Sequence, residues 1–366
     1  MRSIVKAFDD APHFLLPFGR GQNIRWTTVS HSATIKSNAP AGRIRKEGYY
    51  CMNIVLLESL GIPDSLLEQY AAKLGAAGHT FTAYPRTGDT AHLIEEARDA
   101  DVLMLANMPL PGEVIRACTH LKFIDVAFTG VDHVDLDAAR EMGAAVSNAS
   151  GYSNDSVAEL TVCMALALLR NLPQVEQRCR TGGTKDGLVG QELRGKTVGL
   201  VGTGAIGSRV AQLFSAFGCR IIASGDHSHK PDTDLITYLP MTEVLAQADI
   251  LSLHCPLNDS TRGLIGAEAI ARMKPGALLL NAARGPVVDT AALAAALQEG
   301  RLGGAGIDVF ETEPPLPVDH PLMHTPNTIV TPHVAFATAQ SMEKRAEIVF
   351  HSLDCWLAGE QINKIL

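Results

Sequence analysis

The chain has 366 residues, which is long enough for two domains, and its apolar content of 46% is ordinary for a globular protein. No apolar run approaches the roughly 20 residues that a membrane-spanning helix needs. The net charge of −8 argues against a general nucleic-acid-binding protein, so we expect neither a nucleic acid nor a membrane as partner.

The seven cysteines are scattered and form no Cys-x-x-Cys pair. An odd, unpatterned set is typical of reduced thiols in the cytoplasm. Cys163 lies within an apolar run, and we expect it to pack in the core. No metal site is predicted.

The first 51 residues carry eight Lys or Arg against three Asp or Glu and show no helical or alternating period. We expect residues 1–51 to be a disordered extension or an overlong start, because a strand-like run begins directly after Met52. The alternative is an organelle presequence, against which Asp9 and Asp10 count.

After Met52 the pattern predicts strands at 54–57, 102–105, 123–127 and 145–146, with helices at 64–77 and 111–118. Asp64 is expected to cap the first of these helices. An apolar helix at 156–169 follows, buried on most faces, and is expected to bridge two domains.

The next region predicts strands at 197–201, 220–223, 250–254, 277–281, 304–308 and 328–331. A helix at 290–299 has Asp289 as its N-cap and Gly300 at its C′ position. Alternation of strands and helices favours an α/β fold with a doubly wound parallel sheet. A last helix at 337–357 should return to the first domain. We therefore predict a discontinuous domain of 52–152 and 333–366 around a dinucleotide-binding domain of 153–332.

Glycines in a G-x-G-x-x-G spacing follow the strand that ends at Val201, and a helix-like stretch comes next. In this context Gly202 permits a tight turn, Gly204 lets the backbone approach a pyrophosphate, and Gly207 lets helix and strand pack closely. The following helix N-terminus offers free N–H groups to phosphate. The alternative is a plain structural turn.

Three polar side chains of complementary chemistry follow successive strands of this domain. Arg284 has the planar fork that binds a carboxylate, His333 titrates near neutrality, and Glu313 could favour the protonated imidazole. Ligands in open α/β sheets bind at such strand ends. Singly, the arginine could cap a helix, the glutamate could be surface charge and the histidine a satisfied core residue. Together they predict a site for oxidation or reduction of a 2-hydroxy or 2-oxo acid.

The chain resembles the D-isomer-specific 2-hydroxyacid dehydrogenases, which include phosphoglycerate dehydrogenase, D-lactate dehydrogenase and glyoxylate/hydroxypyruvate reductase. The matching segments cover nearly all of 52–366 in the family's order. They are FTGVDH at 128–133, NDSVAE at 154–159, GKTVGLVGTGAIG at 195–207, LHCPL at 253–257, NAARG at 281–285, GIDVFETEP at 306–314 and TPH at 331–333.

This resemblance implies a Rossmann-type doubly wound sheet plus a smaller flavodoxin-like α/β domain, and an enzyme that interconverts a 2-oxo acid and a D-2-hydroxy acid by hydride transfer. It implies that Arg284 anchors the carboxylate, that His333 donates the proton, and that Glu313 is the partner of the histidine. The backbone amides of Thr129 and Gly130 would help to hold the carboxylate. The expected cofactor contacts are Gly202, Gly204, Ala205, Ile206 and Gly207 near the pyrophosphate, Asp308 at the nicotinamide amide, and Asp226, Cys255, Pro256, Ala282, Ala283 and Ala335.

The residue that would bind the ribose departs from the family's pattern. Gly225 takes the position where NAD-preferring members carry an acidic residue, and Asp226 falls one later. We favour NAD as cofactor, and NADP stays open because His227, His229 or Lys230 could meet a 2′-phosphate.

The loop at 106–112 lacks the basic residue expected in relatives that handle phosphoglycerate, so we predict a small, unphosphorylated 2-oxo or 2-hydroxy acid as substrate. The resemblance also suggests a homodimer in the cytoplasm. An alternative function is a nucleotide-sensing binding protein, because the C-terminal-binding transcriptional corepressors resemble this family and keep the same three polar residues.

Overall fold

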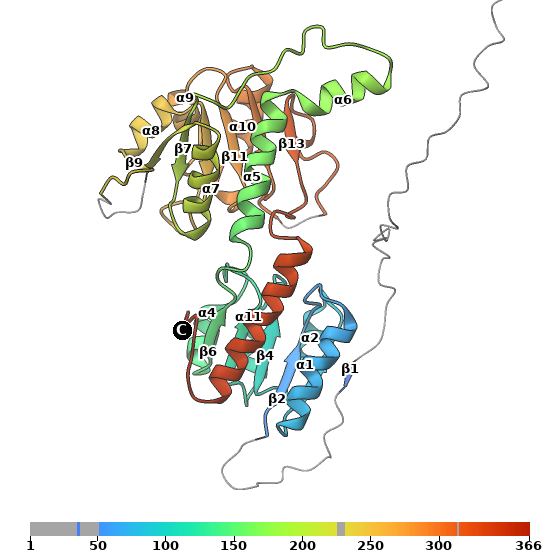
Figure 1. Ribbon diagram of the computed structural model, residues 1–366. Coiled ribbons are helices and arrows are strands. Elements are labelled where there is room, and N and C mark those ends of the chain that lie inside the picture. The colour runs from blue at the N-terminus through green and yellow to red at the C-terminus, as the bar shows by residue number, and fades with distance from the viewer. Residues whose placement is uncertain (1–34, 37–50, 225–230, 313–314) are drawn as a thin grey trace, which may run out of the picture. The chain divides into compact units, whose positions relative to one another are not determined.

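Buried runs of aliphatic residues build two sheets, one parallel throughout and one parallel except for β1, and each sheet is flanked by helices (Figure 1). The computed structural model describes residues 35–36, 51–224, 231–312 and 315–366. Both sheets lie in one compact unit, Thr34–Leu366. The α/β class expected from the alternating strand and helix pattern is confirmed.

The first sheet has the strand order β1-β3-β2-β4-β5-β6, and only β1 is antiparallel to its neighbour. Without β1, this is the flavodoxin-like order. Its strands are β1 (Ile35–Lys36), β2 (Asn53–Leu56), β3 (Thr80–Ala83), β4 (Val102–Leu105), β5 (Phe123–Val126) and β6 (Ala145–Asn148). The helices around it are α1 (Asp64–Ala76), α2 (Thr90–Ala97), α3 (Gly112–Ala117), α4 (Leu136–Glu141) and α11 (Ala339–Leu357).

The second sheet has seven parallel strands in the order β13-β12-β11-β10-β7-β8-β9. Its first strand lies in the middle and the order reverses there, as in dinucleotide-binding folds. The strands are β7 (Thr197–Val201), β8 (Arg220–Ser224), β9 (Thr237–Tyr238), β10 (Ile250–Leu253), β11 (Leu278–Asn281), β12 (Gly304–Ile307) and β13 (Thr328–Val330). The helices of this part are α5 (Asn154–Leu169), α6 (Leu172–Arg180), α7 (Ala205–Ala216), α8 (Met241–Gln247), α9 (Ala267–Arg272) and α10 (Thr290–Gln298), with short 3₁₀ turns at Gly285–Val287 and Pro321–Met323.

Helix α11 brings the end of the chain back onto the first sheet, as Figure 1 shows. Trp356 stacks on Phe123 of β5 with ring centroids 4.8 Å apart, and Phe350 stacks on Tyr70 of α1 at 4.0 Å. The N-terminus of α11 is fixed by a capping box between Thr338 and Ser341. Stacked aromatic pairs of this kind add to the burial of apolar area and secure the return.

Two local predictions are wrong. Asp64 is the first residue of α1 and makes no capping hydrogen bond; Pro63 precedes the helix, and its carbonyl accepts from the amides of Leu66 and Leu67. Cys163 is exposed, not buried, because it lies on the one face of α5 that does not pack against the sheet or α7. That face continues through Glu159 and the end of the helix, at the i, i+4 spacing of one helical stripe.

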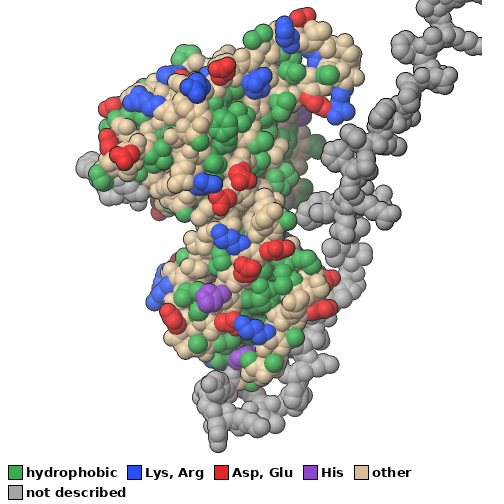
Figure 2. Space-filling view, in the orientation of Figure 1, with side chains coloured by type: hydrophobic (Ala, Val, Ile, Leu, Met, Phe, Trp, Pro, Cys, Tyr) green, Lys and Arg blue, Asp and Glu red, His purple; other side chains and the backbone are tan. Residues whose placement is uncertain are grey.

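No single described helix is long and apolar enough to cross a membrane. The pair α5 and α6 passes that test together, although the two helices are bent by 61° relative to each other. Most of α5 packs within the core beneath the seven-stranded sheet, against α7, β11 and β12. On the face shown in Figure 2, acidic and basic side chains are interspersed.

Candidate active site

A cavity of about 680 Å³ opens where loops from both sheets meet the carboxyl ends of the strands around β7. This volume suits a cofactor or substrate-sized ligand. The cavity brings together most of the residues that the sequence singled out, from both regions of the chain. These are Thr129, Gly130, Gly204, Ala205, Ile206, Cys255, Pro256, Ala282, Ala283, Arg284, Asp308, His333 and Ala335.

The glycine-rich turn lies between β7 and α7. Gly202 has a φ of 95°, and a Cβ at this position would meet the carbonyl oxygen of His254 at 2.7 Å, so a larger residue is disfavoured twice over. A Cβ on Gly207 would overlap the carbonyl of Gly202, so this glycine lets α7 pack onto the strand. A Cβ on Gly204 would meet nothing within 4 Å. Helix packing therefore explains Gly207, but it leaves Gly204 to be explained by a ligand that approaches closely.

The N-terminus of α7 faces this cavity through Ala205 and Ile206. Gly204 is the N-cap residue and makes no side-chain cap, and its carbonyl accepts from the amide of Ser208. The first amides of a helix have no intrahelical partner, and they carry the positive end of the helix dipole. The residues present therefore fit the pyrophosphate of a dinucleotide.

Arg284 follows β11, and its guanidinium is held by a carboxylate far away in the sequence. Nε donates to both carboxylate oxygens of Asp132 at 3.0 and 3.2 Å, and Nη2 donates to Oδ1 at 2.9 Å. Nη1 donates to the carbonyl of Ala283 at 2.8 Å. Burial raises the pKa of Asp132, but the hydrogen bond and positive charge of Arg284 outweigh it and lower the pKa below its usual value.

The loop after β5 supplies backbone donors beside this arginine. Among the described residues, the amides of Thr129 and Gly130 have no hydrogen-bond partner, and the Thr129 hydroxyl oxygen is buried without one. The carbonyl of Thr129 accepts from Asn148 Nδ2 at 2.7 Å, which fixes the loop from β6. Two adjacent free amides beside an arginine form a binding site for a small anion.

His333 lies in the loop after β13 with a φ of 53°, a left-handed conformation that is uncommon for residues other than glycine. Asp308 holds this loop: its carbonyl accepts from the His333 amide at 2.8 Å, and its carboxylate accepts from the amides of Val334 and Ala335 and from the hydroxyl of Thr331. Burial raises the pKa of Asp308, while these hydrogen bonds oppose the rise. Uncommon backbone conformations that their surroundings hold in place cluster at functional sites.

Aromatic rings surround the imidazole. Phe128 and Phe336 meet His333 edge-on, with ring centroids 5.7 and 5.4 Å away. Tyr152 lies beside both phenylalanines, and burial raises the pKa of its hydroxyl. This wall limits the space around the imidazole and lowers the local polarity, which strengthens electrostatic interactions with a bound substrate.

Two predicted residues lie outside the described part of the chain. Glu313, expected beside the histidine, and Asp226, expected at the ribose, fall in segments 313–314 and 225–230. Their assignments stay predictions, as do His227, His229 and Lys230.

Two residues that the sequence did not single out border the cavity. Asp132 is the partner of Arg284, 152 positions away, and His254 directly follows β10. Nε2 of His254 lies 2.8 Å from the Ser252 hydroxyl, and burial lowers its pKa to about 4, so this imidazole is neutral near neutral pH. Both residues lie in segments that match the family, and this match was the sequence signal from which they could have been identified.

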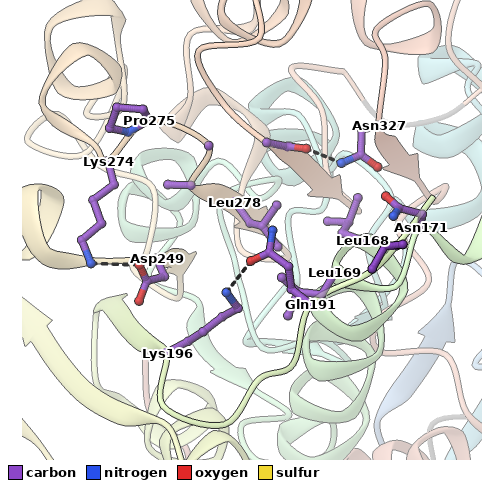
Figure 3. Close-up of a pocket in the computed structure, with 14 residues that line it drawn as sticks. Leu168, Leu169, Asn171, Gln191, Lys196, Asp249, Lys274, Pro275, Leu278 and Asn327 are labelled. Carbon is purple, nitrogen blue, oxygen red and sulfur yellow. Dashed lines mark hydrogen bonds and ion pairs between the residues drawn. The ribbon is translucent and has the colours of Figure 1, made fainter. Parts of the chain in front are cut away.

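A second cavity, of about 350 Å³, lies at the opposite edge of the seven-stranded sheet (Figure 3). Lys274 pairs there with Asp249 at 2.8 Å, and Lys196 donates to Gln191 at 2.7 Å. Asn327 donates to the carbonyl of Gly303. Two pairs of polar side chains in this cavity are thus bonded to each other, and its lining residues include no histidine or arginine that could move a proton or bind a carboxylate bidentately.

Comparison with known proteins agrees with this geometry. Residues 162–335 match the NAD-binding domain of the D-isomer-specific 2-hydroxyacid dehydrogenases. The chain is 39% identical to a glyoxylate reductase of Thermofilum pendens over 280 residues, which is 73% of this chain and 81% of that protein. It is 31% identical to a hydroxypyruvate reductase of Blautia hydrogenotrophica over 294 residues, 77% of this chain and 90% of that protein.

Among solved structures, D-lactate dehydrogenase from Aquifex aeolicus in complex with NAD and lactic acid superimposes with a TM-score of 0.74 at 29% identity, and the match covers 84% of this chain and 96% of that one. These relatives are reductases and dehydrogenases, and they do not support the alternative of a nucleotide-sensing corepressor. The chain belongs to the D-isomer-specific 2-hydroxyacid dehydrogenase family, whose members are NAD-dependent oxidoreductases that interconvert 2-oxo acids and D-2-hydroxy acids.

Proposed function

We propose that this protein reduces a small, unphosphorylated 2-oxo acid to the D-2-hydroxy acid, with Arg284 binding the carboxylate and His333 donating the proton. One observation carries the proposal. Arg284, His333, the free amides of Thr129 and Gly130, and the N-terminus of α7 all border the same cavity. A carboxylate binder, a proton donor and a dinucleotide site are the parts that this reaction requires.

A bound nicotinamide dinucleotide supplies the hydride. The chain's own residues do the rest: Arg284 and the Thr129–Gly130 amides hold the substrate carboxylate, and so fix which face of the carbonyl carbon is presented. His333 donates its proton to the carbonyl oxygen as the negative charge develops there. The rings of Phe128 and Phe336 exclude water from around the imidazole.

Glu313 is proposed as the partner of His333, because a carboxylate beside an imidazole stabilises the positive charge of the form that donates the proton. Asp226 is proposed at the ribose, and NAD is the favoured cofactor. The other predicted cofactor contacts are Cys255, Pro256, Ala282, Ala283 and Ala335, all of which border the cavity.

The experiment is a substrate panel. The purified protein is given glyoxylate, hydroxypyruvate, pyruvate and 3-phosphohydroxypyruvate, each with NADH and with NADPH, and oxidation of the cofactor is followed. We expect the unphosphorylated acids to be reduced with NADH, because the loop at 106–112 has no basic residue for a phosphate. Preference for the phosphorylated acid, or reduction of none, would refute the proposal.

We further propose the domain division 52–152 with 333–366 around 153–332, a homodimer as the assembly, and the cytoplasm as location. Helix α6 has no buried residue and its Leu172 is 55% exposed, so we propose the interface near this helix. Light scattering on the purified protein tests the dimer; a monomer at micromolar concentration would rule it out.

A further inference from the structure

Asp132 holds three of the guanidinium contacts that orient Arg284. A guanidinium has five N–H groups: one on Nε and two on each terminal nitrogen. Asp132 takes the Nε–H and one N–H of Nη2, and the Ala283 carbonyl takes one N–H of Nη1. Within the described residues, this leaves one N–H on each terminal nitrogen, which is the number that a carboxylate accepts in a two-pronged contact.

The backbone of the loop sets the position of the same guanidinium. A Cβ on Gly130 would overlap Arg284 Nη2, and it would lie 2.9 Å from Asp132 Oδ1. The guanidinium therefore lies directly against the backbone at Gly130, whose amide is one of the two without a partner. The remaining N–H groups of Arg284 therefore lie beside the free amides of this loop.

We propose that Asp132 is a positioning residue for the reaction, acting through Arg284: it fixes the guanidinium against Gly130 so that the substrate carboxylate is bound in one orientation. This rests on the proposed function of Arg284. Without the Asp132 carboxylate, the Arg284 side chain would sample several rotamers. Each substrate that binds would then have to fix the side chain in one rotamer, at a cost in conformational entropy. A misplacement of about 1 Å at a reacting centre can cost about 10²-fold in rate.

A purely electrostatic role predicts the opposite result. Asp132 carries a negative charge close to the site of an anionic substrate, and its removal would strengthen attraction for the substrate. If the role of Asp132 is purely electrostatic, the variant without the carboxylate should have a lower KM and an unchanged kcat. If Asp132 positions Arg284, the same variant should have a lower kcat, because the substrate carbonyl is no longer held in line with the proton donor.

The test is a double-mutant cycle on kcat for reduction of glyoxylate with NADH, or of pyruvate if glyoxylate is not reduced. Asp132→Ala should lower kcat by about 10–100-fold, and Asp132→Asn by less, since its amide oxygen can still accept one hydrogen bond. In an Arg284→Ala background, Asp132→Ala should change kcat by less than about twofold, because the residue through which it acts is absent.

The matched control is Glu141→Ala, which removes a carboxylate from another arginine, Arg116, at an exposed pair 2.8 Å long. It should leave kcat unchanged. Melting temperature and NADH binding report folding; if Asp132→Ala does not fold, Asp132→Asn carries the cycle. Equal losses in both backgrounds, or a lower KM with unchanged kcat, would overturn the inference. If the wild-type protein reduces no acid of the panel, it is the proposed function that fails.

Discussion

The two edges of the seven-stranded sheet carry polar groups of similar kinds but leave them in different states. At the amino edge, Lys274 and Asp249 satisfy one another, as do Lys196 and Gln191 (Figure 3). At the carboxyl edge, part of the Arg284 guanidinium remains without a partner among the described residues, as do two amides of the loop that comes to this edge from β5 of the other sheet. Since unpaired polar groups cost free energy when buried, they persist where a ligand completes them. In this sheet the satisfied polar groups lie at the edge without the predicted chemistry, and the incomplete ones border the cavity that would hold the ligands.

The largest effect is expected when the reactive side chains at the carboxyl edge are removed. His333→Gln should lower kcat by about 10²–10⁴-fold, because the proton donor is lost. Arg284→Ala should lower kcat and also raise KM, because ground-state binding of the carboxylate is lost. Steady-state kinetics with the preferred 2-oxo acid check both, and near-normal kcat in His333→Gln would remove the role assigned to this histidine.

A second prediction separates packing from ligand approach in the glycine turn. Gly207→Ala places a Cβ on the Gly202 carbonyl, so it should lower stability by about 1–3 kcal/mol and weaken NADH binding. Gly204→Ala meets no protein atom within 4 Å, so it should keep the melting temperature and weaken NADH binding by about tenfold or more. Calorimetry and fluorescence titration measure the two effects. A Gly204→Ala variant that binds NADH normally would show that no phosphate approaches this position.

A third prediction concerns the acid partner. Reduction requires the protonated imidazole, and the Glu313 carboxylate favours that form, so Glu313→Gln should lower kcat/KM more at alkaline than at acid pH. We expect about a tenfold loss near about pH 8.5 and a smaller one near about pH 6. Profiles of the two proteins that stay parallel across pH would mean that Glu313 is only surface charge.

The smallest effect is expected at the amino edge. Burial raises the pKa of Asp249, but hydrogen bonds from Lys274 and the Thr197 amide outweigh it, so the pKa lies below its usual value. A carboxyl whose pKa is lowered by folding contributes stability above its unfolded pKa, and this contribution is lost as pH falls through the folded value. Asp249→Asn should therefore cost about 1 kcal/mol at neutral pH and less below about pH 4, with kcat unchanged. Urea unfolding across pH measures it; a large loss of kcat would show that the two edges are not independent.

Much of the seven-stranded sheet could be predicted because its signals are local. Buried aliphatic runs locate β7, β10 and β11, and a single strand-glycine-helix sequence locates the turn before α7. The cap of α10 by Asp289 was equally readable, and the structure has its carboxylate accepting from Ala292. Such features depend on residues within a few positions of each other.

Features that depend on distant residues were not predictable in this way. The pairing of Asp132 with Arg284 joins loops 152 residues apart, and nothing in either loop specifies the other. The short elements β3, α2 and α4 were not predicted, although Asp89 and Asp135 cap the two helices with their own side chains. The exposure of Cys163 has the same origin, since composition shows that a helix is apolar but not which stripe the fold covers.

Asp308 attaches the loop of His333 to the seven-stranded sheet. The carboxylate and carbonyl of Asp308 anchor the histidine at the end of β12, although the chain is already leaving for α11. The proton donor and the nucleotide-binding turn are therefore both attached to the seven-stranded sheet. The loop of Thr129 and Gly130 belongs to the other sheet, and the ion pair between Asp132 and Arg284 connects the two sheets. If the two sheets moved relative to each other, the amides of Thr129 and Gly130 would move, while Arg284 and His333 would keep their positions on the seven-stranded sheet.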